Sequence, residues 1–153
     1  MNLIKAILVD DEPRGLKILE LLMRGYTGEV AVVASCTDPE DAIVQINTLQ
    51  PDLLIMDIQM PNLNAFDVLS AIQARHIEVI FATAYNSYAL RAFQYSAVDY
   101  LLKPIDEDHF SRAINKAIER IRSKHVHQNY EALLYNIQKL KHTDDMKICI
   151  PDS

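Results

Sequence analysis

The feature that most constrains the fold is an alternation, repeated five times, between a short apolar run and a stretch with apolar residues three and four apart. Short apolar runs are typical of buried strands, and the second spacing is typical of amphipathic helices. The alternation predicts a parallel sheet covered by helices on both faces. The predicted strands cover residues 3–9, 30–36, 52–57, 78–82 and 98–101. The predicted helices lie near residues 13–24, 39–49, 65–75 and 87–96, and a fifth begins at about Asp106.

The predicted helix ends carry residues that suit them. Pro13 fits the first turn of a helix, where its missing N–H is not needed. Asp38 is placed to cap the helix that Pro39 opens, and Pro51 separates that helix from the next strand. The local signals therefore agree with the periodicity.

Polar residues follow four of the predicted strands. In a parallel sheet with right-handed crossovers the carboxyl ends of the strands share one edge, and ligands bind beyond that edge. The first, third, fourth and fifth strands end at Asp10 and Asp11, at Asp57, at Thr83 and at Lys103. We therefore expect these side chains to meet in one site.

Each of these residues, taken alone, has an ordinary structural explanation. The acidic run that starts at Asp10 suits a helix N-terminus, where the helix dipole favours negative charge. Asp57 could cap the following turn, Thr83 could be a strand-end hydroxyl, and Lys103 could belong to a plain loop. Their joint placement at one edge favours the functional interpretation.

The combination of residue types indicates phosphoryl chemistry. Three carboxylates at about 5 Å repel by roughly 3 kcal/mol per pair at an effective dielectric of about 20, so the cluster calls for a cation. Oxygen ligands of this kind suit Mg2+, which commonly also binds phosphate oxygens. One carboxylate is then free to attack phosphorus and form an acyl phosphate. Lys103 supplies a positive charge and Thr83 a hydroxyl for the transferred oxygens.

Four motifs, ILVDDEP, LLIMDIQMP, FATAY and DYLLKP, occur in this order along the chain. With them, residues 3–122 resemble the receiver domain of two-component response regulators. The resemblance implies a flavodoxin-like, doubly wound (βα)5 fold whose five parallel strands have the order 2-1-3-4-5. Ala65 departs from the family, which usually has glycine in that loop. Because alanine tolerates positive φ less well, we expect that loop to differ in conformation.

The resemblance assigns the metal and phosphoryl chemistry residue by residue. Asp57 is implied to accept a phosphoryl group from a sensor histidine kinase. Asp10 and Asp11 are implied to bind Mg2+ together with Asp57, and the backbone carbonyl of Gln59 adds a further ligand. The domain is expected to catalyse only its own phosphorylation and dephosphorylation, so it is not an enzyme in the usual sense.

The resemblance also implies a switch. Thr83 and Lys103 are implied to contact the phosphoryl group, Tyr100 to act as the switch aromatic, and the peptide bond before Pro104 to be cis. Phosphorylation is expected to shift an existing equilibrium at the face made by the helix near 87–96, the last strand and the fifth helix. The expected result is a homodimer.

A narrower resemblance concerns the output. The stretch AYNSYALRAFQYSAVDYLLKPID resembles the receivers of LytTR-family transcription regulators, and MKICIP resembles the first strand of that family's DNA-binding domain. We therefore expect a receiver domain at 1–123, a linker or helical extension at 124–145, and the start of a truncated DNA-binding domain at 146–153. Within the extension, an apolar stripe could pair with a second copy or cover its own domain: Tyr130, Leu133, Leu134, Ile137 and Leu140.

Composition excludes several classes. The net charge of -6 argues against direct binding of nucleic acid by this chain, so DNA is expected only through the additional domain. The spacing of Cys36 and Cys149 suggests neither a zinc site nor a disulfide framework. With no signal peptide and no long apolar segment, a cytoplasmic location is expected and a membrane partner is not.

Three alternatives are weaker. A Mg2+-dependent phosphatase of the haloacid dehalogenase type needs the pattern DxD after its first strand, where this chain has Asp10-Asp11-Glu12. A flavodoxin-type FMN carrier needs a run of Ser, Thr and Gly after that strand, which is missing. His125 and His127 lack a third metal ligand nearby, so we interpret them as solvated linker residues.

Overall fold

The structure, a computed structural model, describes residues 2–73 and 76–143. Within these residues one parallel sheet has the strand order β2-β1-β3-β4-β5, which confirms the predicted fold class. Its strands match the predicted ones to within one residue at each end. They are β1 (Ile4–Val9), β2 (Val30–Cys36), β3 (Leu53–Met56), β4 (Glu78–Thr83) and β5 (Asp99–Leu102).

The described helices follow the predicted order, with two corrections. They are α1 (Pro13–Met23), α2 (Pro39–Leu49), α3 (Ala65–Ala71), α4 (Ala89–Gln94) and α5 (Glu107–Thr143). The third is shorter than predicted, since the backbone turns extended at Ile72 and the next N–H, that of Gln73, binds the Asn47 side chain at 2.9 Å. The fourth is shorter because a 3-10 turn precedes it and Ser96, with φ of 59°, adopts the left-handed conformation.

Capping residues fix the starts of three helices. Pro13 opens α1, and the Asp38 side chain accepts a hydrogen bond from the backbone of Glu40 at 3.3 Å, both as predicted. At α3, the side chain of Asn64 accepts from the backbone of Asp67 while the Asp67 side chain accepts from the backbone of Asn64. Reciprocal capping of this kind satisfies two N–H groups that would otherwise lack partners.

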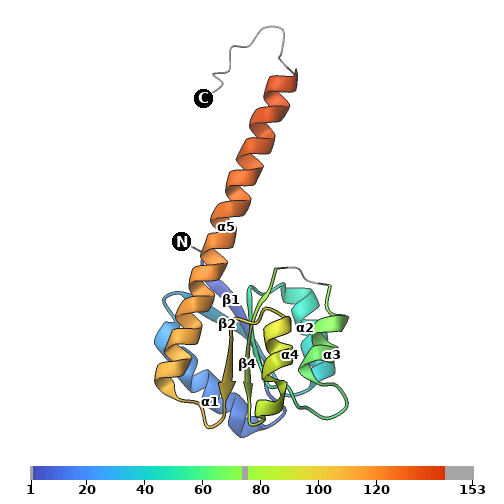
Figure 1. Ribbon diagram of the computed structural model, residues 1–153, viewed down its shortest axis with the longest axis vertical. Coiled ribbons are helices and arrows are strands. Elements are labelled where there is room, and N and C mark those ends of the chain that lie inside the picture. The colour runs from blue at the N-terminus through green and yellow to red at the C-terminus, as the bar shows by residue number, and fades with distance from the viewer. Residues whose placement is uncertain (1, 74–75, 144–153) are drawn as a thin grey trace. The chain divides into compact units, whose positions relative to one another are not determined.

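The sheet is sandwiched between two layers of helices. In Figure 1, α1 and the first turns of α5 lie on one side of the strands, and α2, α3 and α4 lie on the other. Side chains that alternate along the strands fill both layers. Thus Ile7 and Val9 belong to the core beneath α2 and α3, which is closed by the ring contact between Phe66 and Phe81. Because both faces are covered, all four residues of β3 are buried.

The sequence left open whether the stretch after residue 123 is a linker or an extension of the fifth helix. Residues 107–143 form one helix, so the stretch after residue 123 extends the fifth helix as far as Thr143. Contacts divide the chain into two compact units between Arg120 and Ile121. The segment 146–153, predicted to begin another domain, lies outside the described residues. Over residues 2–73 and 76–143, no helix has both the length and the apolarity of a membrane span.

Candidate functional site

The backbone at the carboxyl edge of the sheet brings the predicted site residues together. The strand ladder continues one residue beyond the strands, where the N–H of Asp10 binds the carbonyl of Cys36 at 3.0 Å and that of Asp57 binds the carbonyl of Val9 at 3.0 Å. On the other side, the N–H of Lys103 binds the carbonyl of Thr83 at 2.8 Å. These bonds fix the positions from which the side chains enter the site.

Three carboxylates form the centre of this site. Asp10, Asp11 and Asp57 each offer an oxygen atom, and these atoms lie within 4.8 Å of one another. Asp10 is fully buried, and Asp57 is 6% exposed. Burial, followed by the charges of Asp10 and Asp57, raises the pKa of Asp11 above its ordinary value. The cluster therefore concentrates negative charge that a cation would relieve.

Lys103 neutralises part of the negative charge of these acids. Its ammonium donates to Oδ2 of Asp10 at 2.6 Å and to Oδ2 of Asp57 at 3.0 Å, and its side chain is 22% exposed. Burial lowers the pKa of Lys103, but hydrogen bonds to both carboxylates outweigh burial and leave it above the ordinary value. The lysine is thus held in its charged form between two of the three acids.

Local turns orient the two buried acids. Oδ1 of Asp10 accepts a hydrogen bond from the backbone of Glu12 at 2.9 Å, and Oδ1 of Asp57 faces the backbone N–H of Gln59 at 3.4 Å. Gly15 was not predicted to matter. A Cβ atom at Gly15 would lie 2.2 Å from Oδ2 of Asp10, so any side chain there would force the carboxylate to move.

A second group of contacts joins Thr83 to Tyr100. Thr83 is fully buried at the end of β4, and its Oγ1 lies 3.5 Å from the backbone nitrogen of Tyr85. The hydroxyl of Tyr100 donates to the backbone carbonyl of the same Tyr85. Burial raises the pKa of Tyr100, which keeps its hydroxyl protonated as a donor. The loop after β4 therefore links the two predicted switch residues, Thr83 and Tyr100. The link runs through backbone atoms of Tyr85, so the sequence did not indicate it.

Two loops near the site, after β5 and after β3, have distinctive backbone conformations. The peptide bond between Lys103 and Pro104 is cis. In the loop after β3 the positive φ of 72° occurs at Asn62, whereas Ala65 is the first residue of α3 and has no positive φ. Asparagine tolerates the left-handed region better than most residues. The positive φ of this loop is thus adopted by Asn62 rather than by Ala65, so the alanine is compatible with the local backbone.

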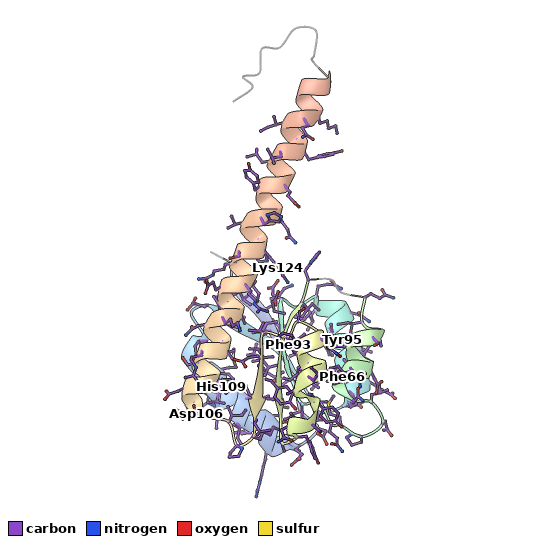
Figure 2. All side chains as sticks on the ribbon, viewed as in Figure 1. Phe66, Phe93, Tyr95, Asp106, His109 and Lys124 are labelled. Atoms are coloured by element: carbon purple, nitrogen blue, oxygen red, sulfur yellow. The ribbon has the colours of Figure 1, made fainter. Side chains whose placement is uncertain are left out.

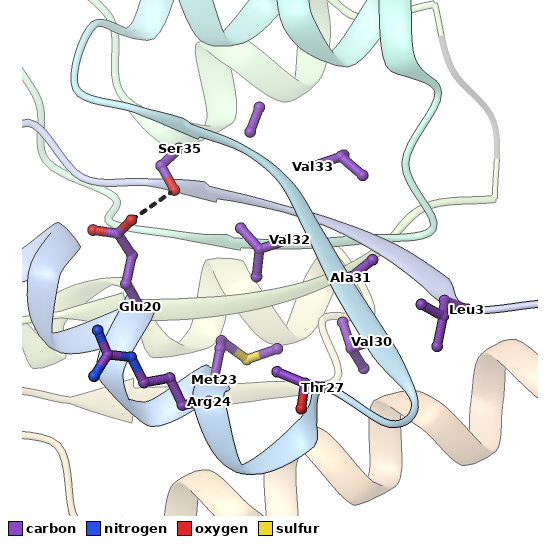
Figure 3. Close-up of a pocket in the computed structure, with 11 residues that line it drawn as sticks. Leu3, Glu20, Met23, Arg24, Thr27, Val30, Ala31, Val32, Val33 and Ser35 are labelled. Atoms are coloured by element: carbon purple, nitrogen blue, oxygen red, sulfur yellow. Dashed lines mark hydrogen bonds between the residues drawn. The ribbon is translucent and has the colours of Figure 1, made fainter.

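Other side chains singled out in the sequence have local partners. His127 lies 3.0 Å from Glu131, one turn further along α5. A hollow of about 650 Å³ lies between α1 and the edge strand β2, where Ser35 donates a hydrogen bond to Glu20 at 3.5 Å (Figure 3). None of the predicted site residues lines this hollow.

Comparison with known proteins identifies the family. A family model described as the response regulator receiver domain matches residues 6–115. The chain belongs to this family.

Individual proteins that this chain resembles are also regulatory proteins or response regulatory domains. The transcriptional regulatory protein BtsR of Salmonella typhi is 35% identical over 140 residues, which are 91% of this chain and 56% of that protein. The positive alginate biosynthesis regulatory protein of Pseudomonas aeruginosa is 37% identical over 114 residues, 73% of this chain and 46% of that protein. The crystal structure of the response regulatory domain of protein mrkE from Klebsiella pneumoniae has a TM-score of 0.70 at 28% identity, covering 78% of this chain and 98% of that domain. The chain thus spans about half the length of these two curated relatives.

Proposed function

We propose that this chain is a phosphorylation switch in which Asp57 accepts a phosphoryl group from a sensor histidine kinase. The observation that carries the proposal is the contact of Lys103 with both Asp10 and Asp57, beside the third acid, Asp11. A buried cluster of this composition has the parts that phosphoryl transfer needs, namely a carboxylate nucleophile and positive charge placed around it. Membership of the receiver family supports the same function.

Asp57, Lys103 and Thr83 would have separate roles in the transfer. The transfer breaks the P–N bond of a phosphohistidine on the kinase and forms a P–O bond to Asp57, while the histidine nitrogen takes up a proton. Lys103 already contacts the acceptor carboxylate and can follow an oxygen of the arriving group with its flexible ammonium. The Thr83 hydroxyl lies at the same sheet edge and would bind another oxygen. Attack of water on the acyl phosphate would break the P–O bond to Asp57, release inorganic phosphate and return Asp57 to its free carboxylate.

The donor set fits Mg2+. Asp10, Asp11 and Asp57 would hold the ion through carboxylate oxygens, and Gln59 would add its backbone carbonyl. Hard oxygen ligands with room for further oxygens match the preference of this ion. When bound, the ion would neutralise the carboxylates and the arriving phosphoryl oxygens.

The output of the switch would pass through α4. Thr83, drawn towards a phosphoryl group, would pull on the loop at Tyr85, whose carbonyl binds Tyr100. Only Ala92 of α4 is buried, and Arg91 stacks over the Phe66 ring at 4.1 Å from its centroid, so this helix is held to the core by few side chains. A small change at the site can therefore bias two arrangements of the α4–β5–α5 face.

This face also has the surface of an interface. Leu90 is 72% and Phe93 80% exposed on α4, and Leu102 at the end of β5 is 45% exposed. Figure 2 shows Phe93 on α4 and His109 at the start of α5, where His109 pairs with Asp99 of β5 at 3.1 Å. Large apolar side chains in such a setting favour burial against a partner. We propose that phosphorylation produces a homodimer through this face.

The output itself is proposed from the relatives. Both are described as regulatory proteins, one of them transcriptional, and this chain covers about half of each. We propose that residues 1–123 are the receiver part of a longer regulator of the LytTR type, with 124–145 as the connecting helix and 146–153 as the start of the DNA-binding domain. DNA binding would belong to that domain.

Transfer of radiolabel from an autophosphorylated sensor kinase tests the proposal. The chain should take up close to one phosphoryl group per molecule, and a chelator of divalent cations should stop the uptake. Turnover of an added phosphomonoester at an enzymatic rate, without uptake from any kinase, would instead support the phosphatase alternative.

A further inference from the structure

The later part of α5 carries an apolar row whose spacing matches a heptad repeat. Val126, Tyr130, Leu133 and Ile137 follow one another at intervals of four, three and four residues, and the interval of three that comes next leads to Leu140 in the sequence. This is a spacing of 3.5 residues, the a and d positions of a heptad repeat. Helices that cover a globular core usually have a broader apolar face with a period of 3.6. We call Val126, Tyr130, Leu133 and Ile137 the α5 seam.

The α5 seam is exposed along its length. The exposed fractions are 69% for Val126, 59% for Tyr130, 57% for Leu133 and 39% for Ile137. Apolar side chains in a row of this kind are driven to find a partner. The regular spacing fits a partner that is itself a helix with the same repeat.

The residues beside the seam suit a second copy of this chain. In the heptad register, His127 and Leu134 flank the seam on one side and Asn136 on the other, and His127 pairs with Glu131 of its own helix at 3.0 Å, so two identical helices bring no pair of like-charged Lys, Arg, Asp or Glu side chains together at these positions. The charged residues Glu131 and Lys139 fall on outer positions of the repeat. Repulsion between copies, which would select a different partner, is thereby avoided.

One pair of residues in the seam favours two strands. Counting Val126 as position d places Tyr130 and Ile137 at position a and Leu133 at position d, so Ile137 and Leu133 are that pair. A β-branched residue at a combined with leucine at d favours parallel two-stranded coiled coils. We propose that the α5 seams of two copies pair as a short parallel coiled coil, which forms together with the phosphorylation-dependent dimer and holds the two output segments side by side. This inference rests on the proposed function for its trigger.

The size of the seam explains why a trigger is needed. Each seam side chain would bury roughly 60–120 Å². The eight seam side chains of two copies would together bury roughly 480–960 Å², less than the roughly 1,200–2,000 Å² of a stable interface. The coiled coil should therefore not form alone at ordinary concentrations. Once the receiver faces have dimerised, the two helices are tethered at an effective concentration in the millimolar range, and the seam can close.

Cysteine crosslinking tests the pairing. In the 153-residue chain with Cys149→Ser, Leu133→Cys places a thiol in the seam, and Tyr135→Cys places one on the outer face, where Tyr135 is 65% exposed. With Mg2+ and beryllofluoride as phosphoryl mimic, oxidation should crosslink the Leu133→Cys chain at least about tenfold faster than the Tyr135→Cys chain. Without beryllofluoride both rates should be low.

Two outcomes would overturn the proposal. Equal crosslinking of the two variants, in samples that sedimentation shows to be dimeric, would mean that the receivers dimerise while the seams stay apart. A lowered melting temperature of the monomer on Leu133→Asp would mean that the seam covers its own domain. The first result is scored only in samples that are dimeric, and the second needs no phosphoryl mimic, so failure of the pairing is distinguishable from failure of Asp57 to accept a phosphoryl group, which labelling measures separately.

Discussion

The ammonium of Lys103 lies 2.6 Å from Oδ2 of Asp10, closer than the 3.0 Å that separates it from Oδ2 of Asp57. The lysine thus forms its shorter contact with the fully buried acid. The charged form of Asp11 is disfavoured, because burial and the charges of the other two acids raise its pKa. The three carboxylates therefore contribute unequally to stability, and substitutions can separate their roles.

Asp11→Asn should stabilise the metal-free protein. The substitution removes one charge from a cluster in which that charge is disfavoured, and we expect the melting temperature to rise by about 2–5 °C. Mg2+ should raise the melting temperature of the unsubstituted chain by mass action but have little effect on the variant. Thermal unfolding with and without Mg2+ measures both effects.

Asp10→Asn is the matched control. It also removes a negative charge, but it leaves Lys103 with only Asp57 as a charged acceptor. We expect no stabilisation from this change, even without metal. Identical responses of the two variants would contradict the unequal roles of the acids.

Lys103→Met should destabilise the metal-free protein at neutral pH. The variant leaves Asp10 and Asp57 without their shared cation, at a cost of about 2–3 kcal/mol, below the roughly 3–5 kcal/mol of a fully buried pair because the ammonium is 22% exposed. Urea unfolding in a chelating buffer measures the difference. Mg2+ should stabilise the variant more than the unsubstituted chain.

The pH dependence of that difference follows from the pKa of Lys103. Its value in the folded chain is raised above the ordinary 10.5, so its stabilising contribution is fully present below 10.5 and is lost as the pH rises through the folded-state value. The titration of Lys103 should therefore not change the difference in unfolding free energy between the Lys103→Met variant and the unsubstituted chain from about pH 6 to about pH 9. A difference that vanished within this range would show that Lys103 is not held as the charged partner of these acids.

The fold was predictable because burial governs the strands so completely. Each residue of β3 is buried, so its apolar run could only be read as a central strand. The α4 region was harder, since Leu90 and Phe93 have helical spacing but are exposed. Periodicity reports that a side chain is apolar, and it does not distinguish a core from a surface that awaits a partner.

At the site, strand ends were predictable and backbone contacts were not. Asp10, Asp57 and Lys103 meet because parallel strands share a carboxyl edge, which their order along the chain already indicates. The clearance at Gly15 and the carbonyl of Tyr85 depend on the path of the backbone. Any residue type could present that carbonyl, so no sequence signal marks it.

Phe93→Asp should prevent dimerisation while leaving phosphorylation intact. Phe93 is 80% exposed, so the change should not disturb the monomer, but a buried charge at the proposed interface should weaken the dimer at least about tenfold. Val44→Asp is the control, because Val44 is 57% exposed on α2, away from that face. Sedimentation with beryllofluoride compares them. Equal dimerisation of both variants would place the interface elsewhere.

The central claim is that Asp57 is the phosphoacceptor, and radiolabel transfer to Asp57→Asn tests it most directly. Asparagine has nearly the shape of aspartate but cannot form the acyl phosphate, so the variant should fold and take up no label from the kinase or from acetyl phosphate. Asp41→Asn, at an exposed position on α2, should be labelled like the unsubstituted chain. Stoichiometric label on folded Asp57→Asn protein would contradict the account.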